Sequence, residues 1–112
     1  MTIFEKIAAG EIPAKIIHEA EDFIAFHDIN AQAPVHVLIV PRKCITRLAE
    51  ADAMQADLLG RMLYATRGIA QKLGVLESGY RVVINNGRDA GESVPHLHIH
   101  LLAGRALAWP PG

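Results

Sequence analysis

The chain has 112 residues, 51% of them apolar, and a formal net charge of −1 at pH 7. This length suits one domain over residues 1–112, and the apolar content is sufficient for a core without disulfides or a structural metal. The single cysteine excludes an internal disulfide, the scattered basic residues exclude a stripe for duplex nucleic acid, and no apolar run approaches the roughly 20 residues of a membrane helix. We therefore expect a cytoplasmic globular protein.

The first half of the chain predicts a short helix and three strands. Thr2 and Glu5 fit a capping box and Gly10 fits a stop, which predicts a helix over residues 3–9. Residues 15–19 and 22–27 predict two strands around an acidic turn. After a loop over residues 30–34, residues 36–40 are apolar and largely β-branched up to Pro41, as in a buried strand.

The second half predicts one long helix and two strands. Apolar residues recur at spacings of three and four over residues 54–73, with Asp52 to cap the start of the helix and Gly74 to end it. A strand over residues 80–84, a polar loop with glycines over 85–93 and a last strand over 96–102 follow. Strands joined by short turns with one long helix inserted indicate an α+β fold with a mainly antiparallel sheet.

Three histidines, His96, His98 and His100, alternate in the last predicted strand. Alternate side chains of a strand share one face, about 6.6 Å apart, so we expect the three rings to line one surface while the intervening apolar residues enter the core. The row is compatible with zinc, although a third ring about 13 Å from the first is hard to bring to the same ion. It also suits phosphoryl chemistry, in which a neutral imidazole attacks and its neighbours donate hydrogen bonds. A solvated surface run is the third alternative, and the strictly apolar positions between the histidines disfavour it. The residues alone favour phosphoryl chemistry.

The polar loop before the histidines contains Asn85, Gly87, Gly91 and Ser93. Glycines let backbone N–H groups approach an anion closely, and the serine offers a hydroxyl. An ordinary hairpin connection is the alternative, and the adjacent histidines favour contact with a ligand. Neither a phosphate-binding G-x-x-x-x-G-K-[ST] loop nor a G-x-G-x-x-G motif occurs, so an ordinary NTPase or dinucleotide fold is not supported.

The run from His96 to Leu102 resembles the histidine triad signature, His-φ-His-φ-His-φ-φ with φ apolar. The similarity extends to residues 2–4, 11–15, 25–29, 32–36 and 109–112, which resemble the Hint branch of the histidine triad (HIT) family, the histidine triad nucleotide-binding proteins or purine nucleoside phosphoramidases. The chain departs from the pattern at Ala103, where a second glycine before Gly104 is common. The resemblance covers nearly the whole chain as a single HIT domain.

This resemblance implies a five-stranded antiparallel sheet with one short N-terminal helix and one long helix. It also implies a homodimer in which two sheets join into one continuous ten-stranded sheet. The implied activity is hydrolysis of the P–N bond of nucleoside 5′-phosphoramidates to the nucleoside monophosphate. His98 would be the nucleophile and form a nucleotidyl-histidine, His100 would hold a phosphate oxygen, and His96 would fix the position and tautomer of His98. Ser93 would hydrogen-bond the leaving nitrogen or the bridging oxygen, and Asn85 would help to orient it. Fixed donors rather than a metal or cofactor would meet the transition-state charge.

The resemblance also implies the residues that bind the nucleotide. Asp28 would take the ribose hydroxyls, Asn85 and Gly91 would act on the phosphate side, and Trp109 would come from the partner subunit. An apolar purine pocket that tolerates adenine and guanine would be formed by Ile3, Phe4, Ile7, Phe26, His27 and Ile29. Without the resemblance, the apolar members of this set fit core packing, and Trp109 fits packing on its own chain. The broad apolar face of the long helix favours a dimer interface over core packing alone.

Two other functions are compatible with these residues. One is dinucleoside polyphosphate hydrolysis or nucleotidyl transfer on the same scaffold, which Ser93 and the Trp109 tail disfavour. The other is a non-catalytic role, as a nucleotide-binding, partner-binding or zinc-binding regulatory protein, since an active site does not forbid a scaffold role.

Overall fold

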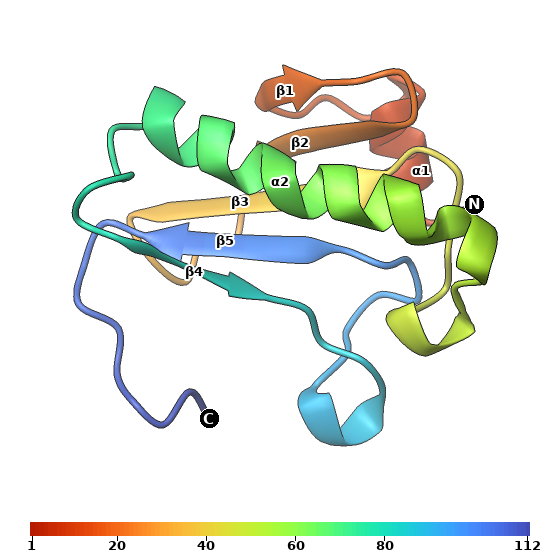
Figure 1. Ribbon diagram of the computed structural model, residues 1–112. Coiled ribbons are helices and arrows are strands. Elements are labelled where there is room, and N and C mark those ends of the chain that lie inside the picture. The colour runs from red at the N-terminus through yellow and green to blue at the C-terminus, as the bar shows by residue number, and fades with distance from the viewer.

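The computed structural model describes residues 1–112 and contains one five-stranded antiparallel sheet in the order β1-β2-β3-β5-β4 (Figure 1). This confirms the predicted α+β fold with a short and a long helix. The helices and strands are α1 (Ile3–Ala8), β1 (Ile16–Glu19), β2 (Phe23–His27), β3 (Val35–Pro41), α2 (Ala56–Lys72), β4 (Tyr80–Val83) and β5 (Ile99–Ala103). Short 3-10 turns lie at Leu48–Glu50, Ala53–Gln55 and Arg88–Ala90. No helix has the length and apolar character that crossing a membrane requires.

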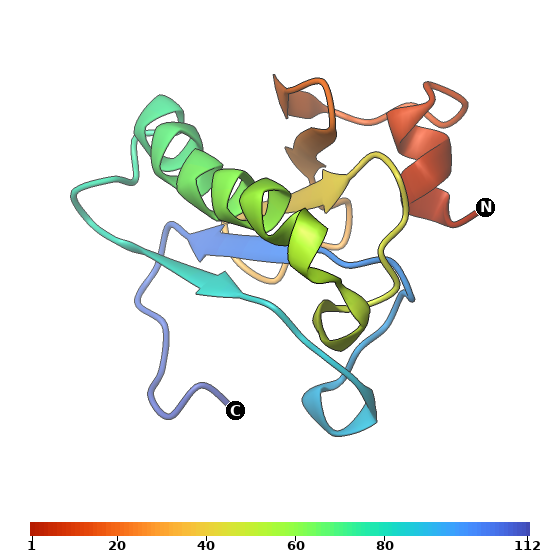
Figure 2. The same cartoon turned by 45° about the vertical axis from the view of Figure 1, so that its right-hand side comes forward.

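The long helix α2 crosses one face of the sheet (Figures 1 and 2). Asp52 is an N-cap residue, as predicted, but the element that it caps is the 3-10 turn Ala53–Gln55. The helix α2 follows this turn directly. The buried side of α2 then packs against alternate residues of β2, β3 and β5, and these contacts form the larger core. The buried residues of this cluster include Met62, Ile69, Ala70, Ala25, Val37, Ile39 and Leu101.

The short helix α1 covers the other face of the sheet. Its capping box is confirmed: Thr2 Oγ1 accepts from the Glu5 backbone N–H, and the Glu5 carboxylate accepts from the Thr2 N–H. Phe4 and Ile7 pack on the remaining alternate residues of β2 and β3, which are Ile24, Phe26, Leu38 and Val40. Because both faces of these central strands are largely buried, their sequences are apolar except for His27 and His36.

The last strand is shorter than the predicted 96–102, because β5 begins at Ile99. Ile99 pairs with Ile39, and the same register continued would set Leu97 opposite Pro41. Proline has no N–H to donate to a sheet, so the ladder ends there. The Leu97 N–H instead donates to the Ile45 carbonyl at 2.6 Å. His96 and His98 therefore lie on an extended segment before the strand, and only His100 lies on the strand.

Candidate active site

A cavity of about 300 Å³ lies beside α1, between the ends of β2 and β3 and the segment before β5. Ten residues predicted for the site line it: Ile3, Phe4, Ile7, Phe26, His27, Asp28, Ile29, Ser93, His98 and His100. Sequence reasoning missed Ile12, Pro13, Ala14, Asn30, Leu38 and Val94. Leu38 pairs with both Phe26 and His100 in the sheet and therefore shares their face, and its alternation with His36 within one strand was the signal in the sequence.

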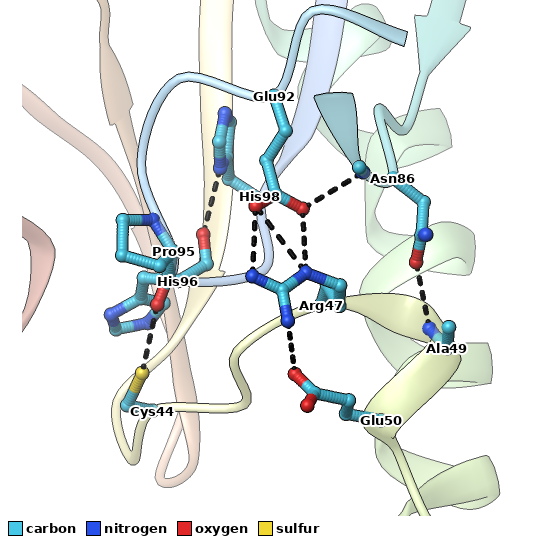
Figure 3. A network of polar contacts seen from close by, with 10 residues as sticks. Cys44, Arg47, Ala49, Glu50, Asn86, Glu92, Pro95, His96 and His98 are labelled. Atoms are coloured by element: carbon cyan, nitrogen blue, oxygen red, sulfur yellow. Dashed lines mark hydrogen bonds and ion pairs between the residues drawn. The ribbon is translucent and has the colours of Figure 1, made fainter. Parts of the chain in front are cut away.

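The His98 ring is held by a backbone carbonyl rather than by a side chain. Its Nδ1 lies 2.7 Å from the His96 carbonyl oxygen. Because a carbonyl oxygen only accepts, Nδ1 carries the proton, and the neutral ring keeps its lone pair on Nε2. Figure 3 shows this second nitrogen on the side of the ring away from the carbonyl. The Phe4 ring packs edge-on against His98, with centroids 5.1 Å apart. The cavity thus contains one oriented, nucleophilic nitrogen.

The His100 ring is oriented by a chain of two hydrogen bonds. The Gln32 backbone N–H donates to His36 Nδ1 at 3.0 Å, so the neutral His36 carries its proton on Nε2. His36 Nε2 lies 2.9 Å from His100 Nδ1 and therefore donates to it. This leaves the proton of neutral His100 on Nε2, a buried atom without a hydrogen-bond partner. His100 thus offers one unused N–H donor beside His98, with the two ring centroids 4.8 Å apart.

Burial keeps the His36 and His100 rings neutral. The pKa of His100 is lowered to about 4, chiefly by burial, with smaller contributions from the neighbouring His98 and His36. Burial is also the main cause of the lowered pKa of His36, and the Asp28 carboxylate partly offsets this by raising that pKa. Asp28 Oδ2 lies 3.5 Å from His36 Nε2, whereas His100 Nδ1 lies 2.9 Å from the same nitrogen. Near neutral pH, the chain from Gln32 to His100 is therefore a relay of neutral groups.

The His96 ring is fully buried on the side of the segment that faces Phe4, where the His98 ring also lies. Nε2 donates to the Pro41 carbonyl at 2.7 Å, and Nδ1 therefore accepts from the Thr2 hydroxyl, also at 2.7 Å. Burial lowers the pKa of His96. Its ring lies against Phe4 and outside the cavity lining, while its carbonyl holds His98. The ring is thus a structural link between the N-terminus and the segment that carries His98.

The remainder of the cavity combines an apolar wall with one carboxylate. Phe4, Ile7 and Phe26 are buried in the wall, whereas Ile29 at its rim is fully exposed. Asp28 follows β2 directly, and its Oδ1 accepts from the Asn30 N–H at 2.8 Å, which fixes the turn. A wider groove of about 720 Å³ continues past Asp28. The opening therefore suits a molecule with a flat apolar part and a polar part.

Besides His96, three predicted residues lie outside the cavity. Ser93 lines it, but Asn85 and Gly91 from the same loop do not. Gly91 has a left-handed backbone, with φ +81°, and ends the 3-10 turn. Trp109 is 80% exposed and contacts Arg81, whose guanidinium carbon lies 6.0 Å from the ring centroid. The single chain therefore does not bring Asn85, Gly91 or Trp109 to the cavity.

Two groups of side chains have donor atoms within 4.8 Å of one another and are compatible with a metal ion. In the group Glu5, Cys44 and His96, both nitrogens of the histidine already have hydrogen-bond partners. In the group Asp28, His36 and His100, the two rings are hydrogen-bonded to each other. An ion at either place would displace these bonds. Both groups offer the nitrogen, oxygen or sulfur ligands that zinc accepts.

Comparison with known proteins identifies the family. The model of the HIT domain family matches residues 9–107, and the chain belongs to this family. Its relatives support the Hint branch. A HIT-like protein from Synechococcus elongatus is 52% identical over 99% of this chain and 96% of its own. A 14 kDa zinc-binding protein from Zea mays is 49% identical over 99% and 88%. The adenylylsulfatase HINT1 from Arabidopsis thaliana is 44% identical over 99% and 76%.

Solved structures agree with this assignment. A HIT family hydrolase from Legionella pneumophila Philadelphia 1 has a TM-score of 0.96 at 43% identity, with complete coverage of both chains. A histidine triad nucleotide-binding protein from Candida albicans has a TM-score of 0.84 at 33% identity, covering 98% of this chain and 83% of that one. The arrangement of one sheet with its two helices is thus that of the HIT fold.

Proposed function

We propose that this protein is a purine nucleoside phosphoramidase, a hydrolase that cleaves the P–N bond of nucleoside 5′-phosphoramidates and releases the nucleoside monophosphate. One observation carries the proposal. The cavity presents the His98 Nε2 lone pair beside the unused Nε2–H donor of His100. A nucleophile next to a fixed donor is what attack on an anionic phosphorus requires. The relatives named as a hydrolase, an adenylylsulfatase and a nucleotide-binding protein support the same class of chemistry.

The reaction proceeds in two displacements at phosphorus. His98 Nε2 forms a bond to phosphorus while the P–N bond breaks, and the leaving amine takes up the hydroxyl proton of Ser93. Ser93 regains a proton from the water that attacks in the second step. Water then attacks the nucleotidyl-histidine, which breaks the N–P bond, releases the monophosphate and restores the neutral ring. The positive charge that His98 acquires is met by the His96 carbonyl at Nδ1. His100 donates to a non-bridging oxygen, so the developing negative charge meets a donor already in place.

The nucleoside lies against the apolar wall in this proposal. A purine packs among Phe4, Ile7 and Phe26, with Ile3, His27 and Ile29 at the rim, and the ribose hydroxyls donate to Asp28. A carboxylate accepts from two hydroxyls at once. The wall contains few polar groups that distinguish base edges, so we expect adenosine and guanosine substrates to react at similar rates.

A second substrate class is supported by one relative. The Arabidopsis protein named adenylylsulfatase is 44% identical to this chain, and the same two displacements apply to an adenylyl sulfate, whose leaving group is sulfate. Sulfate departs without a proton, whereas an amine needs one, so Ser93 in the cavity favours the phosphoramidate. Comparing kcat/KM for adenosine 5′-phosphoramidate, adenylyl sulfate and a diadenosine polyphosphate ranks the three leaving groups.

The proposed enzyme is a homodimer joined along β4. This strand is at the edge of the sheet, with one side unpaired, and pairing with a second β4 extends the sheet to ten strands. Leu63 on α2 is an exposed apolar residue that such an interface covers. The exposed Trp109 then reaches the partner's cavity on the leaving-group side, and Asn85 and Gly91 shape that side. Light scattering of the purified protein tests the dimer, and Trp109→Ala tests the contribution in trans.

Substitution of the nucleophile tests the proposal. We expect His98→Ala to lower kcat for adenosine 5′-phosphoramidate by at least about a thousandfold, because no other group replaces the covalent step. The matched control is His18→Ala, which removes an exposed histidine outside the cavity. If the wild-type protein hydrolyses none of the three leaving-group classes, or if His98→Ala retains activity, the proposed function is wrong.

A further inference from the structure

Two segments that are distant in sequence are tied together beside the cavity (Figure 3). One follows β3 and contains Arg47 and the turn Leu48–Glu50; the other is the loop 84–93 before β5. Arg47 Nε donates to Glu92 Oε1 at 3.0 Å, and Arg47 Nη2 donates to Glu92 Oε2 at 3.1 Å. The Ala49 N–H donates to Asn86 Oδ1 at 2.8 Å. The two-pronged ion pair and this second bond fix the loop to the body of the molecule.

Glu92 also closes the loop on itself. Its Oε1 accepts from the Gly87 N–H at 3.0 Å, and its own N–H donates to the Gly87 carbonyl at 3.1 Å. The hydrogen bonds from Arg47 and then from Gly87 hold the pKa of Glu92 below its ordinary value, so the side chain is a carboxylate at neutral pH. Only 12% of this side chain is exposed. The loop therefore depends on one charged and largely covered side chain for its shape.

The residue after Glu92 is Ser93, which lines the cavity. Between Gly87 and Gly91, both of which have positive φ, the loop lies outside the pairing of β4 with β5. The orientation of Ser93 is therefore set at one end by the carboxylate of its neighbour and at the other by the segment leading to His98. An ion pair that is both covered and two-pronged restricts orientation more than a single exposed contact does.

We propose that Arg47 and Glu92 form a positioning pair that holds the Ser93 hydroxyl toward the leaving group. Neither side chain lines the cavity, so the pair acts through Ser93 and touches no substrate atom. This inference rests on the proposed function, because it assigns Ser93 to the protonation of the departing amine. Its consequence is a dependence on the leaving group: the pair matters when the leaving group needs a proton and hardly matters when it does not.

The test compares two adenosine 5′-monophosphate derivatives, an alkylamine phosphoramidate and a p-nitrophenyl phosphodiester, whose leaving phenolate departs without a proton. We expect Arg47→Met to lower kcat for the phosphoramidate by about tenfold to a hundredfold and to change kcat for the p-nitrophenyl derivative less than about threefold. Glu92→Gln keeps the size of the side chain and loses one oxygen of the pair, so it shows the same pattern to a smaller degree. The Glu92→Gln variant also tests the proposal if the Arg47→Met variant does not fold.

A double-mutant cycle with Ser93→Ala gives the sharper readout. If Arg47 acts through Ser93, Arg47→Met costs less than about twofold when Ser93 is already alanine, because the positioned group is gone. The matched control is Arg61→Met. Arg61 also forms a pair with a carboxylate, 2.6 Å from its Nη2 to Asp22 Oδ2, but it lies on α2, on the opposite face of the sheet. We expect this variant to retain wild-type kcat on both derivatives.

The outcomes separate the two levels of the argument. Wild-type protein that hydrolyses neither derivative overturns the proposed function and with it the role of the pair. Two results with an active wild type overturn the positioning role alone. One is an equal loss of kcat on both derivatives in Arg47→Met, and the other is full additivity of the effects of Arg47→Met and Ser93→Ala. In that case the pair contributes to stability only, and Arg47→Met and Arg61→Met differ in melting temperature rather than in substrate profile.

Discussion

Replacing His36 by phenylalanine tests whether the hydrogen-bond relay sets the tautomer of His100. His36 is 5% exposed, accepts from the Gln32 N–H at 3.0 Å and donates to His100 Nδ1 at 2.9 Å. Phenylalanine fills a similar volume, so the cost of a cavity is small. It leaves the Gln32 N–H and His100 Nδ1 without their partners, and two such losses in a largely buried place destabilise the fold by about 2–3 kcal/mol.

The effect on activity follows from the tautomer. In the wild-type chain, a proton on His100 Nδ1 would face the Nε2–H of His36 across 2.9 Å, so this tautomer is excluded. In His36→Phe both tautomers of His100 are accessible and the ring is less well held. We expect kcat to fall about tenfold, less than the roughly hundredfold loss that follows removal of a transition-state donor outright.

Two measurements check this reasoning together. Nitrogen-15 NMR of the histidines should show His100 protonated on Nε2 in the wild-type protein and a mixture in the variant. Steady-state kinetics should show the tenfold loss, whereas His18→Phe, at an exposed position outside the cavity, should retain full activity. A wild-type His100 that carries its proton on Nδ1 refutes the assignment, as does a His36→Phe variant with unchanged kcat.

Three further predictions follow from the buried rings and the turns around them. Burial lowers the pKa of His100 from 6.5 to about 4, so the unfolded chain binds this proton before the folded chain does as the pH falls. The melting temperature should therefore be constant above about pH 7 and decline as the pH falls from 6.5 toward 4, whereas protonation of His100 in the folded enzyme should affect kcat only near pH 4. A melting temperature that increases as the pH falls over that window contradicts the neutral relay. Gly104→Ala should lower the free energy of unfolding by about 1–3 kcal/mol in a denaturant titration, because φ of Gly104 is +93° and a Cβ there would lie 2.8 Å from Pro34 Cβ. The control is Gly60→Ala on α2, whose added Cβ meets no atom within 4 Å and should not destabilise the fold. Dialysis against a strong chelator should leave kcat unchanged, since no step of the proposed reaction needs an ion; activity that is lost on chelation and restored by zinc contradicts the metal-independent mechanism.

Local patterns predicted the elements of the fold. The Thr2–Glu5 capping box, the spacing of apolar residues in α2 and the apolar runs of β2 and β3 each depend on residues close in sequence. The start of β5 was placed three residues too early, because the ladder ends opposite Pro41, and that pairing becomes visible only once the register of β3 with β5 is known.

The lining of the cavity was predicted through the family resemblance, but the links that orient its groups were not. The ring of His96 bonds to Thr2, which lies 94 residues away in sequence, and the Arg47–Glu92 pair spans 45 residues. Neither link leaves a periodic signal in the sequence, since each depends on how two loops meet in space. For the same reason, the burial of His96 could not be distinguished from exposure by its alternation with His98 and His100.

The central claim is that His98 Nε2 attacks phosphorus and carries the nucleotide for part of the cycle. Mass spectrometry of the protein, acid-quenched within the first turnover of adenosine 5′-phosphoramidate and digested, tests it directly. The account predicts an adenylyl group on the peptide that contains His98, and its absence in His98→Ala. Rapid turnover with no such adduct in the quenched wild-type protein, or with the adenylyl group on another residue, contradicts it.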